Sequence, residues 1–163
     1  MTRRNFLGTS TLALAATGVT APFQRPGKPV LRPALAAYSF RNHFRFMRGN
    51  PRPVKTKPMD MIKFIDFCAD QDCAGAELTS YFFKPEITRQ YLVELRRHAF
   101  LRGLDICGSA VGNNFSLPKG PARDAQIAYV KEWIDHCAVL GAPHIRVFAG
   151  REPKGVSREE ADK

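Results

Sequence analysis

The sequence predicts an α/β fold in which parallel strands are joined by helices. Short apolar runs alternate along the 163-residue chain with longer segments whose apolar residues recur at every third or fourth position. Each strand then returns in the same direction through a helix, which is the connection that parallel pairing needs. No G-x-G-x-x-G or P-loop pattern follows any of the runs. We therefore expect a (β/α)8 barrel, with an open doubly wound α/β sheet as the alternative.

Four short apolar runs are expected to form the strands. They occupy residues 34–40, 74–79, 104–110 and 144–149. Runs of this length, bounded by turn residues, are typical of strands buried on both faces. A capping box at 157–160 predicts the start of a fourth helix close to the end of the chain. We therefore expect residues 34–163 to hold the N-terminal half of a barrel, truncated after about four strands.

Three helices are expected between these strands. The first opens at Asp60, the second at Pro85, and the third after the proline-containing loop at 118–121. Each carries an apolar stripe at helical spacing. Gly103 and Gly141 are expected to end the second and third helices, because glycine readily adopts the left-handed conformation found just beyond a helix end.

The composition is strongly basic. The chain has 25 Lys and Arg against 15 Asp and Glu, a formal charge of +10. Such a charge favours anionic partners, unless acidic residues elsewhere in a larger protein compensate it. None of the four cysteines forms a CxxC pair or lies at zinc-finger spacing from a histidine, so we expect buried free thiols.

The N-terminus predicts an export signal. Arg3 and Arg4 precede an apolar, charge-free run at 12–21 that ends in small residues. We interpret residues 1–21 as a twin-arginine-type signal peptide and expect a periplasmic or extracellular protein. The run is too short for a permanent membrane anchor. Residues 22–33 contain four prolines and are expected to be an extended, Pro-rich linker.

Three segments resemble one known family. They read Ala-Tyr-Ser-Phe at 37–40, Gly-Ala-Glu-Leu-Thr at 75–79, and His-Ile-Arg-Val-Phe-Ala-Gly at 144–150. In this order they are similar to the first, second and fourth strands of xylose isomerase-like TIM barrels of the sugar phosphate isomerase/epimerase type. The resemblance covers 34–163 and implies the N-terminal portion of such a barrel.

The resemblance also implies an activity and a cofactor. Members of the family move a proton between neighbouring carbons of a sugar. They typically use one divalent metal (Mn, Mg, Zn or Co), bound by glutamate, aspartate and histidine residues of the later strands. We therefore expect a metal-dependent sugar or sugar phosphate isomerase or epimerase in the complete protein. Because the metal ligands lie on those later strands, we expect none in this chain, and the chain alone is expected to be inactive.

Five residues are candidates for substrate binding, because barrel ligands bind at the C-terminal ends of the strands. They are Tyr38, Arg41, Glu77, Asn113 and Arg146. Alternative roles remain for most of them. Glu77 could instead form an internal salt bridge with Arg146, Tyr38 could pack in the core, and Asn113 could be a turn residue. No residue is assigned to catalysis.

The loop at 41–57 contains six basic residues and no acid. It could bind a phosphate or carboxylate of the substrate, follow a nucleic-acid backbone, or be a solvated surface. We favour a small-molecule sugar partner and no nucleic acid. Two rival functions remain, an endonuclease IV-like phosphodiester hydrolase and a non-catalytic secreted carbohydrate-binding barrel. His98 and His136 are expected on solvated helix exteriors.

The edges of a half-barrel predict self-association. Edge strands carry unpaired backbone groups. Apolar residues such as Leu35, Leu78, Ile106 and Val147 or their neighbours are expected to face the barrel axis, where they would form an exposed patch. We therefore expect a homo-oligomer or association through the exposed barrel edge.

Overall fold

The computed structural model describes residues 31–55, 57–151 and 155. The chain divides into two units, Met1–Leu31 and Arg32–Lys163, and the following description concerns the second. The predicted signal peptide, most of the linker and the predicted fourth helix lie outside the described residues. Within the described part, no helix is long and apolar enough to cross a membrane.

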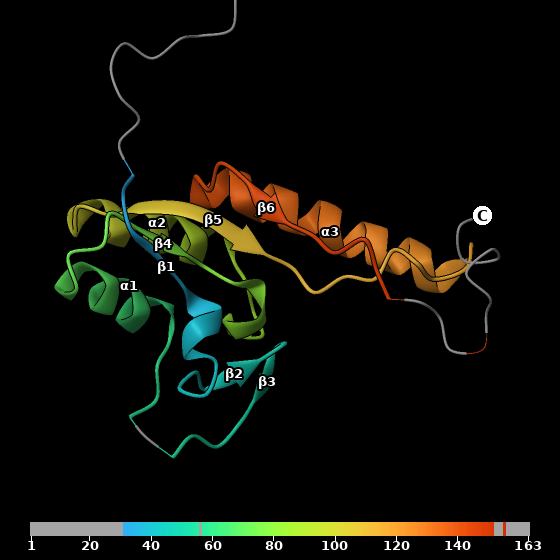
Figure 1. Cartoon of the computed structure of the whole chain (residues 1–163), viewed down its shortest axis with the longest axis horizontal. Coiled ribbons are helices and arrows are strands. Elements are labelled where there is room, and N and C mark those ends of the chain that lie inside the picture. The colour runs from blue at the N-terminus through green and yellow to red at the C-terminus, as the bar shows by residue number, and fades with distance from the viewer. Residues whose placement is uncertain (1–30, 56, 152–154, 156–163) are drawn as a thin grey trace, which may run out of the picture. The chain divides into compact units, whose positions relative to one another are not determined.

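A four-stranded parallel sheet forms the centre of this unit (Figure 1). Its strands are β1 (Ala34–Ala36), β4 (Gly75–Glu77), β5 (Asp105–Ala110) and β6 (Ile145–Arg146), and they lie side by side in sequence order. A doubly wound sheet would reverse this order part-way, which moves some helices to the other face. A sheet that continues in one direction through right-handed crossovers keeps its helices on one face, as in a barrel. The predicted parallel barrel segment is confirmed.

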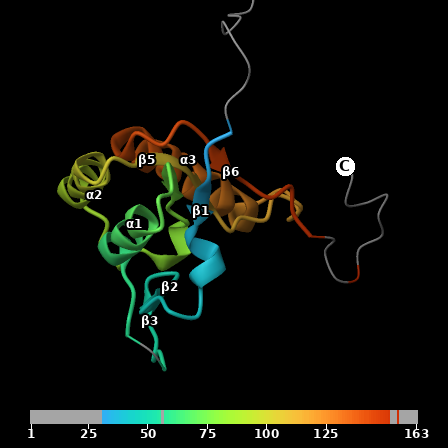
Figure 2. The same cartoon turned by 60° about the vertical axis from the view of Figure 1, so that its left-hand side comes forward.

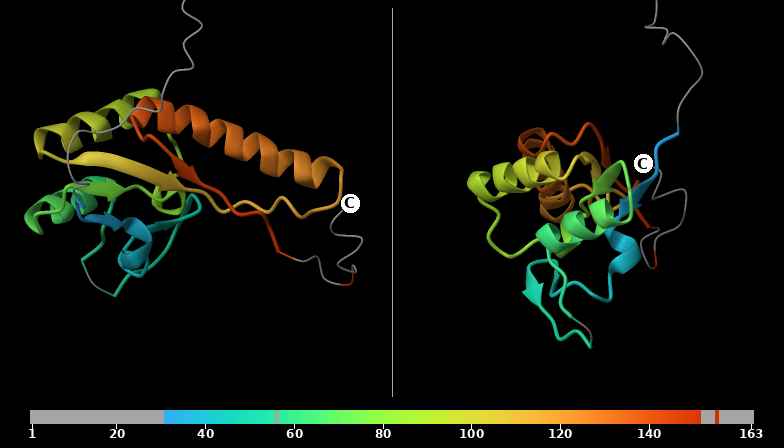
Figure 3. Two further views of the ribbon diagram at one scale, coloured as in Figure 1. Left: turned by 45° about the horizontal axis from the view of Figure 1, so that its top comes forward. Right: turned by 90° about the vertical axis from the view of Figure 1, so that its left-hand side faces the viewer.

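Three helices cover one face of the sheet (Figures 2 and 3). They are α1 (Met61–Asp70), α2 (Arg89–Leu101) and α3 (Pro121–Leu140). Asp60 caps α1 by accepting a hydrogen bond from the backbone N–H of Lys63 at 3.0 Å, and Thr88 caps α2 in the same way. Gly141 ends α3 at φ 77°. The second helix was expected from Pro85, and this start is wrong, because the cap that satisfies its first N–H groups is Thr88.

Strands β1, β4 and β6 are shorter at their C-terminal ends than predicted. After β1 the chain turns into the 3₁₀ helix η2 (Ala37–Phe40), and after β4 it turns into η3 (Ser80–Phe82). Periodicity does not separate such a turn from the last residues of an apolar strand, because both bury apolar side chains. These 3₁₀ turns bring aromatic residues to the C-terminal edge of the sheet.

The apolar strand residues face the helices. Leu35 pairs in register with Ala76, and Ala76 with Ile106, and all three contact the buried core. The opposite face carries small or polar residues such as Gly75 and Glu77. The expectation that Leu35, Leu78 and Ile106 face the barrel axis is therefore wrong. The helices provide the larger apolar layer, and these side chains pack into it.

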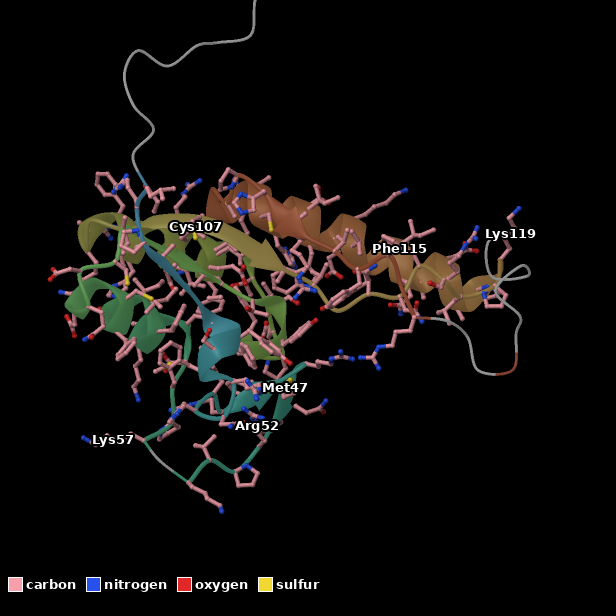
Figure 4. All side chains as sticks on the ribbon, in the orientation of Figure 1. Met47, Arg52, Lys57, Cys107, Phe115 and Lys119 are labelled. Carbon is pink, nitrogen blue, oxygen red and sulfur yellow. The ribbon has the colours of Figure 1, made fainter. Side chains whose placement is uncertain are left out.

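The basic loop forms a hairpin that the sequence did not predict. Strands β2 (Phe46–Met47) and β3 (Asn50–Pro51) pair antiparallel around a two-residue turn, with φ 52° at Arg48 and 76° at Gly49. Two consecutive positive φ angles match the twist of a tight hairpin. Figure 4 labels Arg52 on this segment, and Arg52 Nε donates to the backbone oxygen of Phe44 at 3.0 Å.

The hairpin is joined to the core by stacked aromatic rings. Phe44 is completely buried, and its ring lies on that of Phe82 with centroids 4.5 Å apart and planes at 13°. Lys57, at the far end of the loop, points away from the sheet (Figure 4). One end of the basic loop is thus fixed against η3, whereas the other is exposed.

The four cysteines are free, as predicted, and two of them, Cys68 and Cys137, are buried. Burial raises the pKa of the Cys68 thiol from 9.0 to about 12, so this thiol stays protonated at neutral pH.

The two helix histidines are only partly solvated, with side chains that are 29% exposed at His98 and 18% exposed at His136. His98 Nε2 lies 2.8 Å from Oδ1 of Asp66 on the neighbouring helix. His136 packs edge-on against Trp133 with ring centroids 5.2 Å apart. His98 thus lies between α1 and α2, and the exposed face of α2 is narrower than its sequence pattern indicates.

Candidate functional site

A cavity of about 560 Å³ opens at the C-terminal ends of the four strands. We call it the mouth. Segments that follow all four strands contribute to it, together with the hairpin and the start of α3. Its lining consists of aromatic, cationic and amide side chains, two glycines and one leucine: Tyr38, Tyr81, Phe148, Arg48, Arg146, Arg151, Asn113, Asn114, Gln126, Gly112, Gly150 and Leu117. Barrel enzymes bind their ligands at this end of the sheet.

The mouth brings together three of the five predicted site residues, Tyr38, Asn113 and Arg146. Arg41 and Glu77 do not line it. The Arg41 guanidinium lies 5.5 Å from the centroid of the Tyr38 ring and is exposed. The placement of a residue in the cavity does not itself test substrate binding, so the five assignments stay predictions.

An aromatic wall forms one side of the mouth. Tyr38 remains 46% exposed and meets Tyr81 edge-on, with ring centroids 6.1 Å apart. The Tyr81 ring lies against Gly112, where an added Cβ would come within 2.6 Å of the ring. Glycine at this position therefore provides the space that Tyr81 occupies. Exposed tyrosine faces are suited to packing against the C–H groups of a sugar ring.

Asn113 continues the sheet beyond the end of β6. Its Nδ2 donates to the backbone oxygen of Phe148 at 2.7 Å, and its Oδ1 accepts from the Phe148 backbone N–H at 2.8 Å. The side chain thus takes the place of a neighbouring strand for one residue. This explains why the predicted strand at 144–149 is regular only over β6 and yet still runs along the mouth.

Asn114 connects the segments that follow β5 and β6. Its Oδ1 accepts hydrogen bonds from the backbone N–H groups of Ser116 at 3.2 Å and Arg151 at 3.1 Å. Its own N–H donates to Oε1 of Gln126 on α3 at 3.0 Å. Arg151 is therefore positioned through a residue 37 positions earlier in the chain.

Arg146 projects from β6 into the mouth. Its Nη1 donates to the backbone oxygen of Val111 at 3.1 Å, and its guanidinium lies 4.0 Å from the centroid of the Phe148 ring. The internal salt bridge with Glu77 that the sequence left open is absent from the ion pairs of the described residues. The reason is topological, because β5 lies between β4 and β6.

Glu77 is half-buried on the face of the sheet opposite the helices. Its Oε1 accepts a hydrogen bond from Thr79 Oγ1 at 3.1 Å. The nearby Cys107, labelled in Figure 4, has its pKa raised mainly by burial and further by this carboxylate. Glu77 thus lies deeper along the barrel axis than the mouth residues.

Among the lining residues that were not proposed from the sequence are Tyr81, Gln126 and Arg151. Tyr81 follows a strand end, so its position in the chain could have indicated it. Gln126 belongs to a helix and reaches the mouth only because α3 begins beside it. The position of Arg151 depends on the hydrogen bond that its backbone N–H donates to Asn114 Oδ1. No sequence pattern indicates the last two.

The described residues do not fit a divalent metal. Within 31–55, 57–151 and 155, no group of three or more His, Cys, Asp and Glu residues is arranged to hold a metal ion. The mouth offers guanidinium groups, phenols and amides there, and guanidinium groups repel a cation. Mn²⁺ and Mg²⁺ prefer carboxylate oxygens. No chemical step of this part of the chain is therefore derived through a metal.

The family is decided by a match to a family model. The model described as xylose isomerase-like TIM barrel matches residues 65–163, which is more than half of the chain. The chain belongs to this family. The resemblance inferred from the strand segments is thus confirmed. No curated protein matches the chain in sequence.

A solved structure of similar fold is that of D-psicose 3-epimerase in the presence of D-fructose. The TM-score is 0.56 at 14% sequence identity, and the match covers 80% of this chain and 43% of that protein. The chain of this xylose isomerase-like protein therefore spans less than half the length of that structure. At this identity the likeness shows the fold, and it agrees with the barrel order of the strands.

Proposed function

We propose that this protein is a metal-dependent sugar isomerase or epimerase whose substrate binds in the mouth. The observation that carries the proposal is the position of the mouth at the C-terminal ends of the strands in a member of the xylose isomerase-like family. The fold match to an epimerase studied with D-fructose supports a sugar as the substrate. The volume of about 560 Å³ is sufficient for a monosaccharide.

The described residues bind and orient the substrate in this proposal. Moving a proton between sugar carbons needs an acid and a base within hydrogen-bond reach. The described lining of the mouth contains no carboxylate and no histidine, so those groups would come from elsewhere in the protein. Tyr38 and Tyr81 would pack against the ring, and the arginines would hold polar substituents.

The hydrolase alternative receives no support from the mouth. Endonuclease IV-like enzymes need histidines at the ends of the early strands for their zinc cluster, and none of the residues that line the mouth at these strand ends is a histidine. The carbohydrate-binding alternative differs from the enzyme only in turnover, so the same experiment separates the two. We further propose that the protein is exported, on the basis of the arginine pair and the apolar run that follows it.

The test is to incubate the protein with aldoses and ketoses in D₂O and to follow deuterium incorporation at the reacting carbon by NMR. We expect exchange with Mn²⁺ or Mg²⁺, loss of exchange after treatment with EDTA, and recovery when metal returns. Full exchange without metal would reject the metal dependence. Sugar binding without exchange would favour the carbohydrate-binding barrel, and cleavage of abasic DNA would favour the hydrolase.

A further inference from the structure

Three arginines converge on the mouth from separate segments of the chain. Arg48 comes from the hairpin turn, Arg146 from β6, and Arg151 from the segment after β6. No acidic residue is present among the described residues that line the cavity. The mouth is therefore a positively charged cavity in a protein whose formal charge is already +10.

No carboxylate neutralises these guanidinium groups in the described part of the chain. Its ion pairs join other residues, for example Arg102 at the end of α2 with Asp66 on α1. Arg146 contacts a backbone oxygen and the Phe148 ring, and Arg48 lies 5.2 Å from the centroid of the Tyr81 ring. These contacts orient the two guanidinium groups and leave most of their donors free for a ligand.

The backbones that carry the arginines are fixed to the mouth. The N–H of Arg48 donates to the backbone oxygen of Tyr81 at 2.6 Å, and that of Arg151 donates to Asn114 Oδ1 at 3.1 Å. The buried Phe44 holds the hairpin in place. Cations whose backbones are held in this way bind an anion with a smaller loss of conformational entropy.

We propose that the mouth binds an acidic sugar, meaning a sugar with a phosphate or carboxylate group, and that Arg48, Arg146 and Arg151 surround this group. Guanidinium groups form paired hydrogen bonds with the oxygens of both anions. Tyr38, which is 46% exposed, would face the sugar ring. The proposal rests on the proposed function for the sugar part of the ligand. The arginines alone indicate the anionic part.

The shape of the site favours a small anion over a nucleic acid. The three arginines face one cavity of about 560 Å³, whereas a nucleic-acid strand is followed by a line of exposed cations. Arg45 and Lys57 of the same loop are exposed and do not line the cavity.

The test measures binding to the full chain by calorimetry. Three ligands that differ at one carbon are compared: glucose 6-phosphate, glucuronate and glucose. Inorganic phosphate is the fourth probe. We expect at least one acidic sugar to bind about tenfold or more tightly than glucose, which corresponds to about 1.4 kcal/mol. The ratio of the dissociation constants of glucose 6-phosphate and glucuronate shows whether the site prefers a phosphate or a carboxylate. Equal binding of all three sugars, or no binding of any, would overturn the proposal.

Variants assign the effect to the mouth. Arg48→Gln and Arg151→Gln should each weaken binding of the acidic sugar by about tenfold, since each removes a charge-assisted contact. Arg45→Gln makes the same change in charge on the same hairpin outside the cavity, and it should weaken binding by less than about twofold. Circular dichroism and thermal unfolding verify that the variants remain folded. An equal loss in all three variants would show a non-specific charge effect and reject the site.

The outcome is separable from that of the proposed function. Isomerisation of neutral sugars without preference for acidic ones would reject this inference and keep the isomerase. Arginine-dependent binding of an acidic sugar with no isomerisation of any sugar would reject the isomerase and keep the anion site. Tighter binding of a single-stranded oligonucleotide than of either acidic sugar would overturn the acidic-sugar ligand.

Discussion

Replacing Phe44 by alanine should strongly destabilise the protein. The ring is completely buried and stacks on Phe82 at a centroid distance of 4.5 Å. Removing a buried phenylalanine ring costs about 3–5 kcal/mol, because apolar contacts are lost and a cavity remains. Since a typical domain has a net stability of about 5–15 kcal/mol, Phe44→Ala should remove a large part of it.

Urea unfolding followed by the fluorescence of Trp133 measures this loss, because the chain has one tryptophan and it is 3% exposed. Phe100→Ala is the matched control. Phe100 is 79% exposed, so the same substitution there should change the unfolding free energy by less than about 0.5 kcal/mol. A loss below about 1 kcal/mol in Phe44→Ala, or equal losses in both variants, would show that the hairpin is not anchored by this ring.

Three further predictions concern other parts of the chain. Asn113→Ala removes two hydrogen bonds to Phe148, so the Phe148 amide should exchange with D₂O faster by a factor that corresponds to about 1–2 kcal/mol, and unchanged exchange would contradict the pairing. Cys68 should resist iodoacetamide at pH 8 in the folded protein and react in urea. The pKa of Cys68 is about 12 in the folded protein and 9.0 ordinarily, so above pH 9 the folded state keeps a proton that the unfolded state loses. The contribution of Cys68 to the free energy of unfolding should therefore fall as pH rises from 9 towards 12. Rapid labelling of the folded protein, or a urea midpoint that does not change over this range, would reject the buried thiol. Replacing Arg3 and Arg4 by lysine should retain the precursor inside the cell, as judged by fractionation, and unchanged export would reject the twin-arginine signal.

The parts of the fold that the sequence predicts are those set by periodicity. The three helices and the parallel order of the strands follow from apolar spacing, and Gly141 marks a helix end because few other residues tolerate its positive φ. The hairpin was missed because two-residue strands produce no periodic pattern, and its turn holds Arg48 where glycine or asparagine is usual. The 3₁₀ turns were missed because they directly continue apolar runs and are too short to show a period of their own.

The mouth was only partly predictable, for a different physical reason. Tyr38 and Arg146 follow from their places at strand ends, which topology brings to one edge. Arg151 reaches the mouth through a side chain distant in sequence, and Gln126 through the start of a helix. Such placements depend on tertiary contacts, which local spacing does not encode. The assignment of the apolar strand residues to the barrel axis failed because alternation shows that two faces differ but not which of them faces the helices.

Asn114 makes two loops of this barrel a single unit. Loops at the top of barrels are commonly regarded as parts that can be exchanged one at a time on a constant scaffold. Here the loop after β5 supplies the acceptor that fixes the chain after β6, so a substitution in the first would move an arginine in the second. Transplanting either loop alone would leave a backbone group without its partner, and a change of ligand preference could arise at a residue that never touches the ligand. Engineering of this site would therefore have to exchange the two segments together.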